Sequence, residues 1–256
     1  MSLKKRAVKL LARTYFQPFY KKLHYLALKG MNYGSANSPS DSGEISVLKI
    51  LQKELPMNPV VFDVGANNGQ YLDFILNYFR ELNPNIHVFE PDAVAFRTLE
   101  KRFSNKPNIH LNNLALGHTQ KTGTLYSSGI GGVDGSLVDT EEKDLKKTTI
   151  SVITLDDYCK QHTIEKIHFI KIDVEGFEMN VLKGAKVALE KQHIERIQIE
   201  HGSLQSIIAG TTLYSFIKLL KTYQCYHIKQ NGIYKINYAP IEEIYYNSNY
   251  YFKFKE

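Results

Sequence analysis

From residue 60 onward, short apolar runs alternate with stretches in which apolar residues recur at helical spacing. The short runs predict buried β-strands, and the stretches between them predict helices that cover a sheet. Seven strands are expected, at residues 60–65, 86–91, 109–117, 167–176, 196–202, 225–229 and 250–254. Continuous apolar strands joined by helices indicate an α/β fold with a doubly wound, mostly parallel sheet.

One segment, residues 118–154, interrupts this alternation. Its turn-rich stretch at 129–136 separates two strand-like runs at 124–127 and 148–155, which predicts an inserted hairpin. Because four of the eight residues at 129–136 are glycines, this stretch cannot pack a core, and we expect a mobile lid or a loop on the substrate side.

The positive charge of the chain is concentrated at its start. Residues 1–40 contain eight of the 32 Lys and Arg residues and no Asp or Glu, which leaves 24 cations against 26 carboxylates in the remainder. We expect residues 1–40 to form a basic helical arm with a linker, and residues 41–256 to form the main domain. Because that domain is slightly acidic, no nucleic-acid partner is expected.

Two uses of the basic arm remain open. Its cations and its Leu, Phe and Tyr side chains could bind an anionic membrane surface through residues 1–30, or the arm could pack on the domain or on a second subunit. No apolar run approaches the ~20 residues that span a bilayer, and no signal peptide is recognisable. The two cysteines, Cys159 and Cys225, lack metal-ligand spacing and suit a reducing compartment. We therefore expect a cytoplasmic protein, with peripheral membrane contact as the open alternative.

Two helix boundaries are expected between the arm and the first strand. Gly30 is expected to end the second helix of the arm. Asp41 with Glu44 three residues later fits a capping box, which predicts the start of a helix in the main domain.

The first predicted strand ends in the turn DVGANNG, which runs from Asp63 to Gly69. In an open parallel sheet, ligands bind outside the carboxyl ends of the strands. Gly65 and Gly69 allow a tight turn and a close approach of the backbone to a ligand. The G-x-x-x-G spacing differs from the G-x-G-x-x-G that holds a pyrophosphate. The Asp63 carboxylate would repel phosphate and suits a ligand with an amine; the alternative is a plain turn in which Asp63 caps the helix.

Polar residues also follow the second and third strands. Glu90 lies 21 residues after Gly69 and could accept hydrogen bonds from both hydroxyls of a ribose, as in enzymes that use NAD or S-adenosylmethionine (SAM). Together with the first turn, Glu90 favours SAM. After the third strand, the Asn113 carboxamide and the backbone around Ala115 could bind an adenine edge. The alternatives are that Glu90 caps a helix and that Asn113 lies in a plain turn.

The fourth strand ends in KIDVEGFE, where charged residues are crowded. Lys171 lies in an otherwise apolar strand and needs a carboxylate partner, which Asp173 or Glu200 could supply. Asp173, Glu175 and Glu178 place three carboxylates within six residues, which raises at least one pKa and gives a candidate general base or a cation site. The alternative is an ion-pair network that orders the following helix.

The fifth strand ends in Glu200 and His201, which we expect to face the same cleft as the fourth strand's carboxylates. His201 could act as a base or a ligand, or it could be a turn residue. The nine histidines show no H-x-x-x-H or H-x-H spacing, so no zinc site is predicted.

The order and spacing of DVGANNG, FEPD, NLALG, TLDDY, KIDVEGFEMNVLKGA and IQIEHG resemble those of the FkbM-type SAM-dependent methyltransferases over residues 40–230. The resemblance implies a Rossmann-like SAM-methyltransferase fold, an antiparallel last strand near 250–254, and methyl transfer to a hydroxyl of a sugar, polyketide or other small metabolite. It does not identify the acceptor. Matched onto this chain, it places the SAM site at Asp63, Gly65, Asn67, Gly69, Glu90 and Asn113.

The expected chemistry is an in-line displacement at an already activated methyl group, so the protein must align the acceptor hydroxyl and remove its proton. Asp173 is the first candidate for the base and Glu175 is the second. Glu200 with His201 could complete a base pair or an oxygen-rich Mg²⁺ site, but no ligand spacing demands a metal, so a metal-free base is expected. Lys171 would keep Asp173 or Glu200 ionised.

Two other functions are weighed against a small-molecule or glycan O-methyltransferase. RNA 2′-O-methyltransferases use a Lys-Asp-Lys-Glu constellation, but the fifth strand of this chain ends in Glu200 rather than lysine. A Rossmann-like binding protein without catalytic activity would not need the intact DVGANNG turn together with Glu90. The oligomeric state is not predicted by these patterns.

Overall fold

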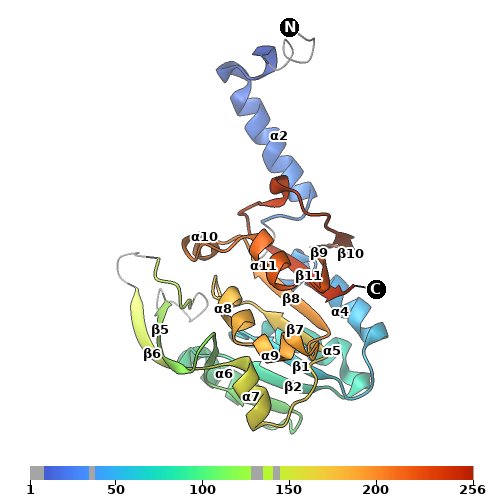
Figure 1. Ribbon diagram of the computed structural model, residues 1–256, viewed down its shortest axis with the longest axis vertical. Helices are drawn as coiled ribbons and strands as arrows, with labels where there is room; N and C mark the ends of the chain where they lie inside the picture. Colours follow the sequence, from blue (N-terminus) through green and yellow to red (C-terminus); the bar gives the residue numbers. More distant parts are fainter. Residues whose placement is uncertain (1–8, 35–37, 128–134, 141–144, 256) are drawn as a thin grey trace.

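The computed structural model describes residues 9–34, 38–127, 135–140 and 145–255. Its main sheet has eight strands in the order β10-β9-β11-β8-β7-β1-β2-β3 (Figure 1). The strands are β1 (Val60–Val64), β2 (Asn85–Phe89), β3 (Ile109–Asn112), β7 (Phe169–Ile172), β8 (Arg196–His201), β9 (Tyr223–Lys229), β10 (Gly232–Lys235) and β11 (Ser248–Phe254). The pairs from β8 to β3 are parallel, whereas β11 runs antiparallel to both of its neighbours. The predicted α/β class and the antiparallel last strand are confirmed.

The prediction of the seven strands is wrong in two respects. Residues 109–117 form two strands, β3 in the main sheet and β4 (Ala115–Leu116) in a second sheet with the order β4-β6-β5. The main sheet also contains β10, which pairs antiparallel with β9. Because β10 is a partly exposed edge strand, it lacks the continuous apolar run from which buried strands were predicted.

Helices cover both faces of the main sheet, as a doubly wound fold requires. One face carries α4 (Glu44–Glu54), α5 (Gln70–Tyr78) and α6 (Ala93–Phe103), which share a core with Val61 and Val88. The opposite face carries α7 (Leu155–Gln161), α8 (Glu178–Lys183), α9 (Lys186–Glu190) and α11 (Leu213–Leu219), which pack around Phe62 and Ile170. Three further short helices are η2 (Arg80–Leu82), α10 (Leu204–Ile208) and η3 (Pro240–Glu242).

The predicted hairpin insertion is present. β5 (Lys121–Ser127) and β6 (Lys146–Ile153) pair antiparallel around a small core that includes Leu125 and Val152. Residues 129–134 of the predicted lid lie outside the described residues. Ser136, at the end of that stretch, donates a hydrogen bond to the backbone carbonyl of Glu175 at 2.6 Å. The hairpin is therefore joined to the turn that follows β7.

The N-terminal arm contains η1 (Thr14–Phe16) and α2 (Gln17–Gly30), and α2 projects away from the domain (Figure 1). α2 ends at Gly30, as predicted. The segment predicted to be a linker is packed on the domain at Tyr33. This side chain is 1% exposed, and its ring centroid lies 4.4 Å from that of His227. The Asn32 amide also donates to the backbone carbonyl of Ile228 at 3.0 Å. Residues that look like a linker in composition are thus packed on the domain.

The first helices of the domain begin differently from the prediction. Asp41 lies inside α3 (Pro39–Ser42), and Gly43, in the left-handed conformation with φ 87°, precedes α4. The capping box of Asp41 with Glu44 is therefore wrong. Instead the Ser42 hydroxyl donates to Glu44 Oε2 at 2.7 Å, and Glu44 is buried. Among the described residues, no helix has the length and apolar character needed to cross a membrane.

Candidate functional site

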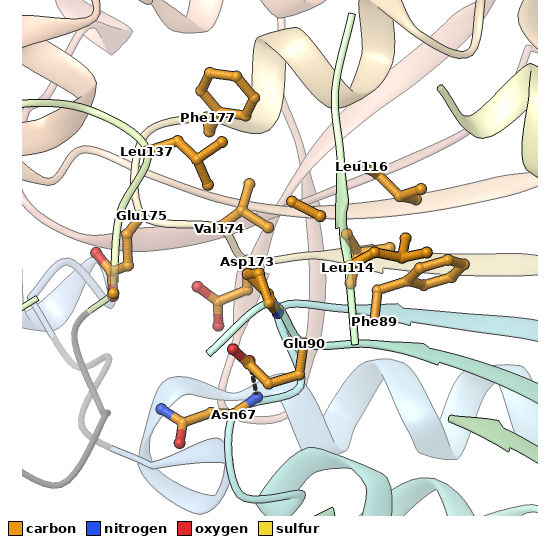
Figure 2. Close-up of a pocket in the computed structure, with 15 residues that line it drawn as sticks. Asn67, Phe89, Glu90, Leu114, Leu116, Leu137, Asp173, Val174, Glu175 and Phe177 are labelled. Atoms are coloured by element: carbon orange, nitrogen blue, oxygen red, sulfur yellow. Dashed lines mark hydrogen bonds between the residues drawn. The ribbon is translucent and has the colours of Figure 1, made fainter. Parts of the chain in front are cut away.

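Two adjoining hollows lie at the carboxyl ends of the parallel strands. The first, which we call the Glu90 hollow, lies at the ends of β1, β2 and β7 beside β4 (Figure 2). The second, the Lys171 hollow, lies at the ends of β7 and β8 beside α4 and α5. Gly65, Asn67, Asp173 and Glu175 line both hollows. A ligand in one hollow would therefore share a wall with a ligand in the other.

The turn after β1 requires glycine at its first position. Gly65 has φ +84°, and a Cβ atom there would lie 1.8 Å from the backbone oxygen of Asp173. This close approach brings the ends of β1 and β7 together. Asn67 follows with φ 51°. Gly69, with φ +85°, starts α5 and packs against Phe103, so it lines neither hollow and shapes the turn.

Glu90 joins the end of β2 to this turn. Its Oε2 accepts the backbone N–H of Asn67 at 2.7 Å, and its Oε1 accepts that of Asp92 at 2.8 Å. The side chain lines the Glu90 hollow beside Asn67 (Figure 2). Burial raises the pKa of Glu90 to about 7, although both backbone hydrogen bonds act in the opposite direction. Each carboxylate oxygen has a further lone pair available to a ligand.

The wall opposite the turn is apolar. Ala115, Leu114 and Leu116 line the Glu90 hollow together with Phe89 (Figure 2). Asn113 is exposed, and its amide donates to the backbone carbonyls of Glu90 at 2.9 Å and of Pro91 at 3.2 Å. Asn113 and Ala115 were both predicted to contact adenine. Ala115 lies in the Glu90 hollow, whereas Asn113 lies outside it and binds the backbone that follows β2.

A row of buried polar residues crosses the sheet beside the hollows, and its middle member, Lys171, lines the Lys171 hollow. Asp63 on β1, Lys171 on β7 and Gln198 on β8 are paired in register, so their side chains lie on the same face. Asp63 is completely buried, and no hydrogen bond reaches either of its carboxylate oxygens from the described residues. Burial raises the pKa of Asp63 to about 6, and the nearby Lys171 charge opposes this rise. Asp63 does not cap α5, which begins after Gly69 without a side-chain cap.

Lys171 connects this row of polar residues to the Lys171 hollow. Its Nζ lies 2.7 Å from Asp173 Oδ2 and 4.8 Å from the centre of the Tyr71 ring. The Lys171 side chain is 6% exposed and that of Asp173 is 27% exposed, so Asp173 presents its carboxylate to the hollow while Lys171 supports it from beneath. Burial would lower the pKa of Lys171, but the surrounding carboxylates outweigh burial and raise it. The lysine is therefore charged.

Asp173 and Glu200 share one hydrogen bond but differ in charge. Burial raises the pKa of Glu200 well above the usual range, and the negative charge of Asp173 adds to this rise. Burial would also raise the pKa of Asp173, but the Lys171 ammonium and the hydrogen bonds from Glu200 and Lys171 outweigh it and lower the pKa. Glu200 is therefore the protonated donor and Asp173 is the ionised acceptor.

The other carboxylates of the KIDVEGFE motif have separate positions. Glu175 lines both hollows and has φ 50°. Glu178 points back into its own turn, where Oε1 accepts the backbone N–H groups of Val174 at 3.1 Å and of Gly176 at 2.9 Å. Of the three carboxylates predicted to be crowded together, Asp173 and Glu175 line the hollows, whereas Glu178 closes the turn.

The prediction that Glu200 and His201 face the cleft of the fourth strand's carboxylates is correct for Glu200, which lines the Lys171 hollow, and wrong for His201. Successive side chains of a strand point to opposite faces of the sheet, and these two residues are consecutive in β8. His201 is buried, and its ring packs against those of Phe216 and Tyr245. Burial lowers the pKa of His201 to about 4, so its imidazole is neutral. It lines neither hollow.

The sequence reasoning missed several residues of the Lys171 hollow. Glu44 lines it and accepts a hydrogen bond from Gln198 Nε2 at 2.6 Å. Asn247 and Asn249 line it from the segment around the start of β11. Gln198 was detectable as a polar residue inside the apolar run of β8, whereas Glu44 was interpreted only as a helix-start signal. No group of three or more His, Cys, Asp or Glu side chains in the described ranges is placed to hold a metal ion.

Comparison with known proteins gives a family match and several related enzymes. The profile of the methyltransferase FkbM domain matches residues 63–224. The hexuronic acid methyltransferase AglP of Haloferax volcanii is 28% identical over 162 residues, which cover 62% of this chain and 64% of AglP. The 2-O-methyltransferase NoeI of Sinorhizobium fredii is 26% identical over 200 residues, covering 70% of this chain and 76% of NoeI. The chain thus spans less than two thirds of the length of AglP.

Among solved structures, the methyltransferase FkbM of Methylobacillus flagellatus is similar to this chain with a TM-score of 0.49 and 18% identity. The match covers 84% of this chain and 50% of that protein.

Proposed function

Because this chain belongs to the FkbM methyltransferase family, we propose that it transfers the methyl group of SAM to a hydroxyl group of an uncharged sugar unit. The observation that carries this proposal is the position of Asp173. Its carboxylate is ionised, is supported by Lys171, and lies on the wall shared by the two hollows. A base at that place can reach a hydroxyl in the Lys171 hollow that faces a methyl donor in the Glu90 hollow.

The residues of the Glu90 hollow fit SAM. The left-handed turn at Gly65 leaves no room for a side chain and lets a ligand approach the backbone. Glu90 offers acceptor oxygens to the ribose hydroxyls, and the apolar wall formed by Leu114, Ala115 and Leu116 suits an adenine ring. The unpartnered Asp63 carboxylate beneath the turn favours a ligand with positive charge. When bound, SAM supplies the electrophilic methyl group.

The chain's own residues then align and deprotonate the acceptor. Asp173 takes the proton from the attacking hydroxyl as the new bond forms, because a sugar hydroxyl is too weak an acid to lose it beforehand. Lys171 keeps Asp173 ionised between turnovers, and the Glu200 carboxyl fixes the orientation of Asp173 through their shared hydrogen bond. Glu175 is the second candidate for the base because it lines the same wall.

The charges around the Lys171 hollow support an uncharged acceptor. Four carboxyl groups line it, those of Glu44, Asp173, Glu175 and Glu200. Lys171 is the only cation among its described lining residues, and it is already paired with Asp173. A sugar with a carboxylate would find no available cation there, whereas sugar hydroxyls can bond to carboxylates and to the amides of the neighbouring asparagines. The ionised Asp173 carboxylate on the wall of the hollow would repel an RNA phosphate placed beside it.

The test uses the full chain, labelled SAM and matched neutral and anionic acceptors. Calorimetry first establishes SAM binding; then label transfer is compared between methyl hexosides and the corresponding methyl hexuronides, with an RNA oligonucleotide as a third acceptor. We expect label on a hydroxyl of a neutral hexoside and little on the hexuronide. Absence of SAM binding would refute the enzyme proposal, transfer to RNA would refute the sugar proposal, and preference for the hexuronide would refute the uncharged acceptor.

A further inference from the structure

The described part of the N-terminal arm exposes an apolar surface that the other described residues do not cover. Leu28 is the one buried residue of α2. Further out on the same helix, Phe19 is 61% exposed, Leu23 is 50% exposed and Leu26 is 67% exposed. Figure 1 shows this helix projecting from the domain. Side chains of this size are costly to leave in water when they form a continuous surface.

These apolar residues form one stripe along α2. Phe19, Leu23 and Leu26 are separated by four and three residues, and Tyr20 lies between the first two on the same side. At about 100° per residue, this spacing places them within roughly 120° of one another. Lys21 and Lys22 lie outside this stripe and are exposed. The helix is therefore amphipathic: one side is aromatic and aliphatic, and the other carries the lysines together with the exposed ring of Tyr25.

The charge of the arm favours an anionic surface over a second copy of the chain. Residues 1–40 contain eight Lys and Arg residues and no Asp or Glu. Two such arms packed against each other would bring cations together with no carboxylate of their own to pair with them. An anionic lipid surface supplies both the negative charge and the apolar layer that the stripe can enter.

We propose that α2 docks on an anionic lipid bilayer, lying in the interface with Phe19, Leu23 and Leu26 in the apolar layer. Lys21 and Lys22 reach the lipid headgroups, and Arg13 in the preceding segment adds a third exposed cation. Lys29 has a different role, because its ammonium lies 5.1 Å from the centre of the Tyr246 ring and donates to the backbone carbonyl of Gly34. That cation fastens the base of the arm to the domain.

The experiment is flotation of the full-length protein with vesicles of phosphatidylcholine alone and with vesicles that also contain phosphatidylserine. We expect binding to the anionic vesicles only, and weakening of that binding with added salt. The variant Lys21→Gln/Lys22→Gln should lower the affinity roughly 30-fold, and Leu23→Asn/Leu26→Asn should also lower it strongly. The matched control Lys146→Gln/Lys147→Gln removes two exposed lysines of β6 and should leave binding unchanged.

Three outcomes would overturn the proposal: equal binding to both vesicles, unchanged binding of the lysine variant, or a sedimentation mass that shows a dimer abolished by Leu23→Asn/Leu26→Asn. All substituted side chains of the arm are exposed, so the domain should remain folded. Methyl transfer to a water-soluble acceptor by the lysine variant should equal that of the wild type, so a failed membrane test and a failed enzyme proposal are distinguishable.

Discussion

The Lys171 ammonium acts on four carboxyl groups but keeps only one of them strongly acidic. Its charge favours ionisation of Glu44, Asp63, Asp173 and Glu200. Burial outweighs this effect at three of them and raises their pKa, whereas direct contact with Lys171 lowers the pKa of Asp173. Direct contact with Lys171 therefore distinguishes Asp173 from the other three carboxyl groups.

Replacement of Asp173 by Asn tests this assignment. The amide keeps the shape of the side chain but cannot accept the proton, so kcat should fall by about 10²-fold or more. SAM should still bind, because Glu90 and the Gly65 turn are unchanged. Single-turnover rates and calorimetry measure the two effects separately.

The matched control for that variant is Asp73→Asn, an identical change at an exposed carboxylate that pairs with Arg102. It should leave kcat unchanged. Near-normal turnover of Asp173→Asn with its acceptor would show that the carboxylates are structural, and Glu175 would then be tested in the same way.

Glu90 is expected to hold the ribose. Removing this charge-assisted contact in Glu90→Ala should cost about 2–3 kcal/mol, or roughly 30- to 150-fold in SAM affinity. Because Glu90 also fixes the turn through Asn67, a weaker affinity alone does not identify the ribose contact. A SAM analogue without the ribose 2′-hydroxyl separates the two effects: the wild type should discriminate against it and the variant should not. Equal discrimination by both proteins would place the ribose elsewhere.

At the scale of elements, the turn between β1 and α5 depends on close contact with the turn after β7. Gly65→Ala would force a Cβ atom onto the backbone oxygen of Asp173 and would strain a φ of +84°. We expect a loss of about 3 kcal/mol or more in the free energy of unfolding, with SAM binding lost as well. Gly30→Ala is the control, because no described atom beyond its chain neighbours and its own helix backbone lies within 4 Å of the added Cβ. Similar denaturant midpoints for both variants would contradict the packing described here.

The turn between β7 and α8 carries a pH dependence. Burial raises the pKa of Glu178 to about 8, so the folded chain keeps a proton that the unfolded chain releases above the ordinary glutamate pKa. The contribution of Glu178 to the free energy of unfolding therefore falls as pH rises through 8, by about 2 kcal/mol between pH 6.5 and 8.5. Glu178→Gln cannot titrate and can still accept both backbone N–H groups, so its unfolding free energy should be less pH-dependent by that amount. Parallel pH profiles would refute this.

The pattern of apolar runs predicted the elements of the parallel sheet well, because buried strands and amphipathic helices each have a clear period. It could not show that residues 109–117 divide between two sheets, since the division depends on β6, a partner distant in sequence. Glu200 lies near Asp173 as predicted, whereas His201, the next residue of β8, points to the opposite face of the sheet. Glu44 was overlooked because its contacts to β8 are 154 residues away.

At the scale of the whole molecule, packing indicates where the arm ends and the domain begins. Tyr33 is 1% exposed against His227, whereas Phe19 is 61% exposed on the projecting part of α2. Tyr33→Ala should therefore lower the free energy of unfolding by about 3 kcal/mol. Phe19→Ala should change it by less than about 0.5 kcal/mol. Chemical denaturation compares the two, and equal effects would contradict a boundary between them.

The base of the arm contacts the Lys171 hollow at Asn247. The backbone N–H of Gly34 donates to the carbonyl of Asn247 at 2.8 Å, and Asn247 lines the hollow. Two binding events that act on one shared segment are linked reciprocally: if docking of the arm changes acceptor affinity by some factor, a bound acceptor changes the affinity of the arm by the same factor. Docking of the arm and binding of the acceptor would then each change the affinity of the other, and this coupling needs no separate regulatory domain.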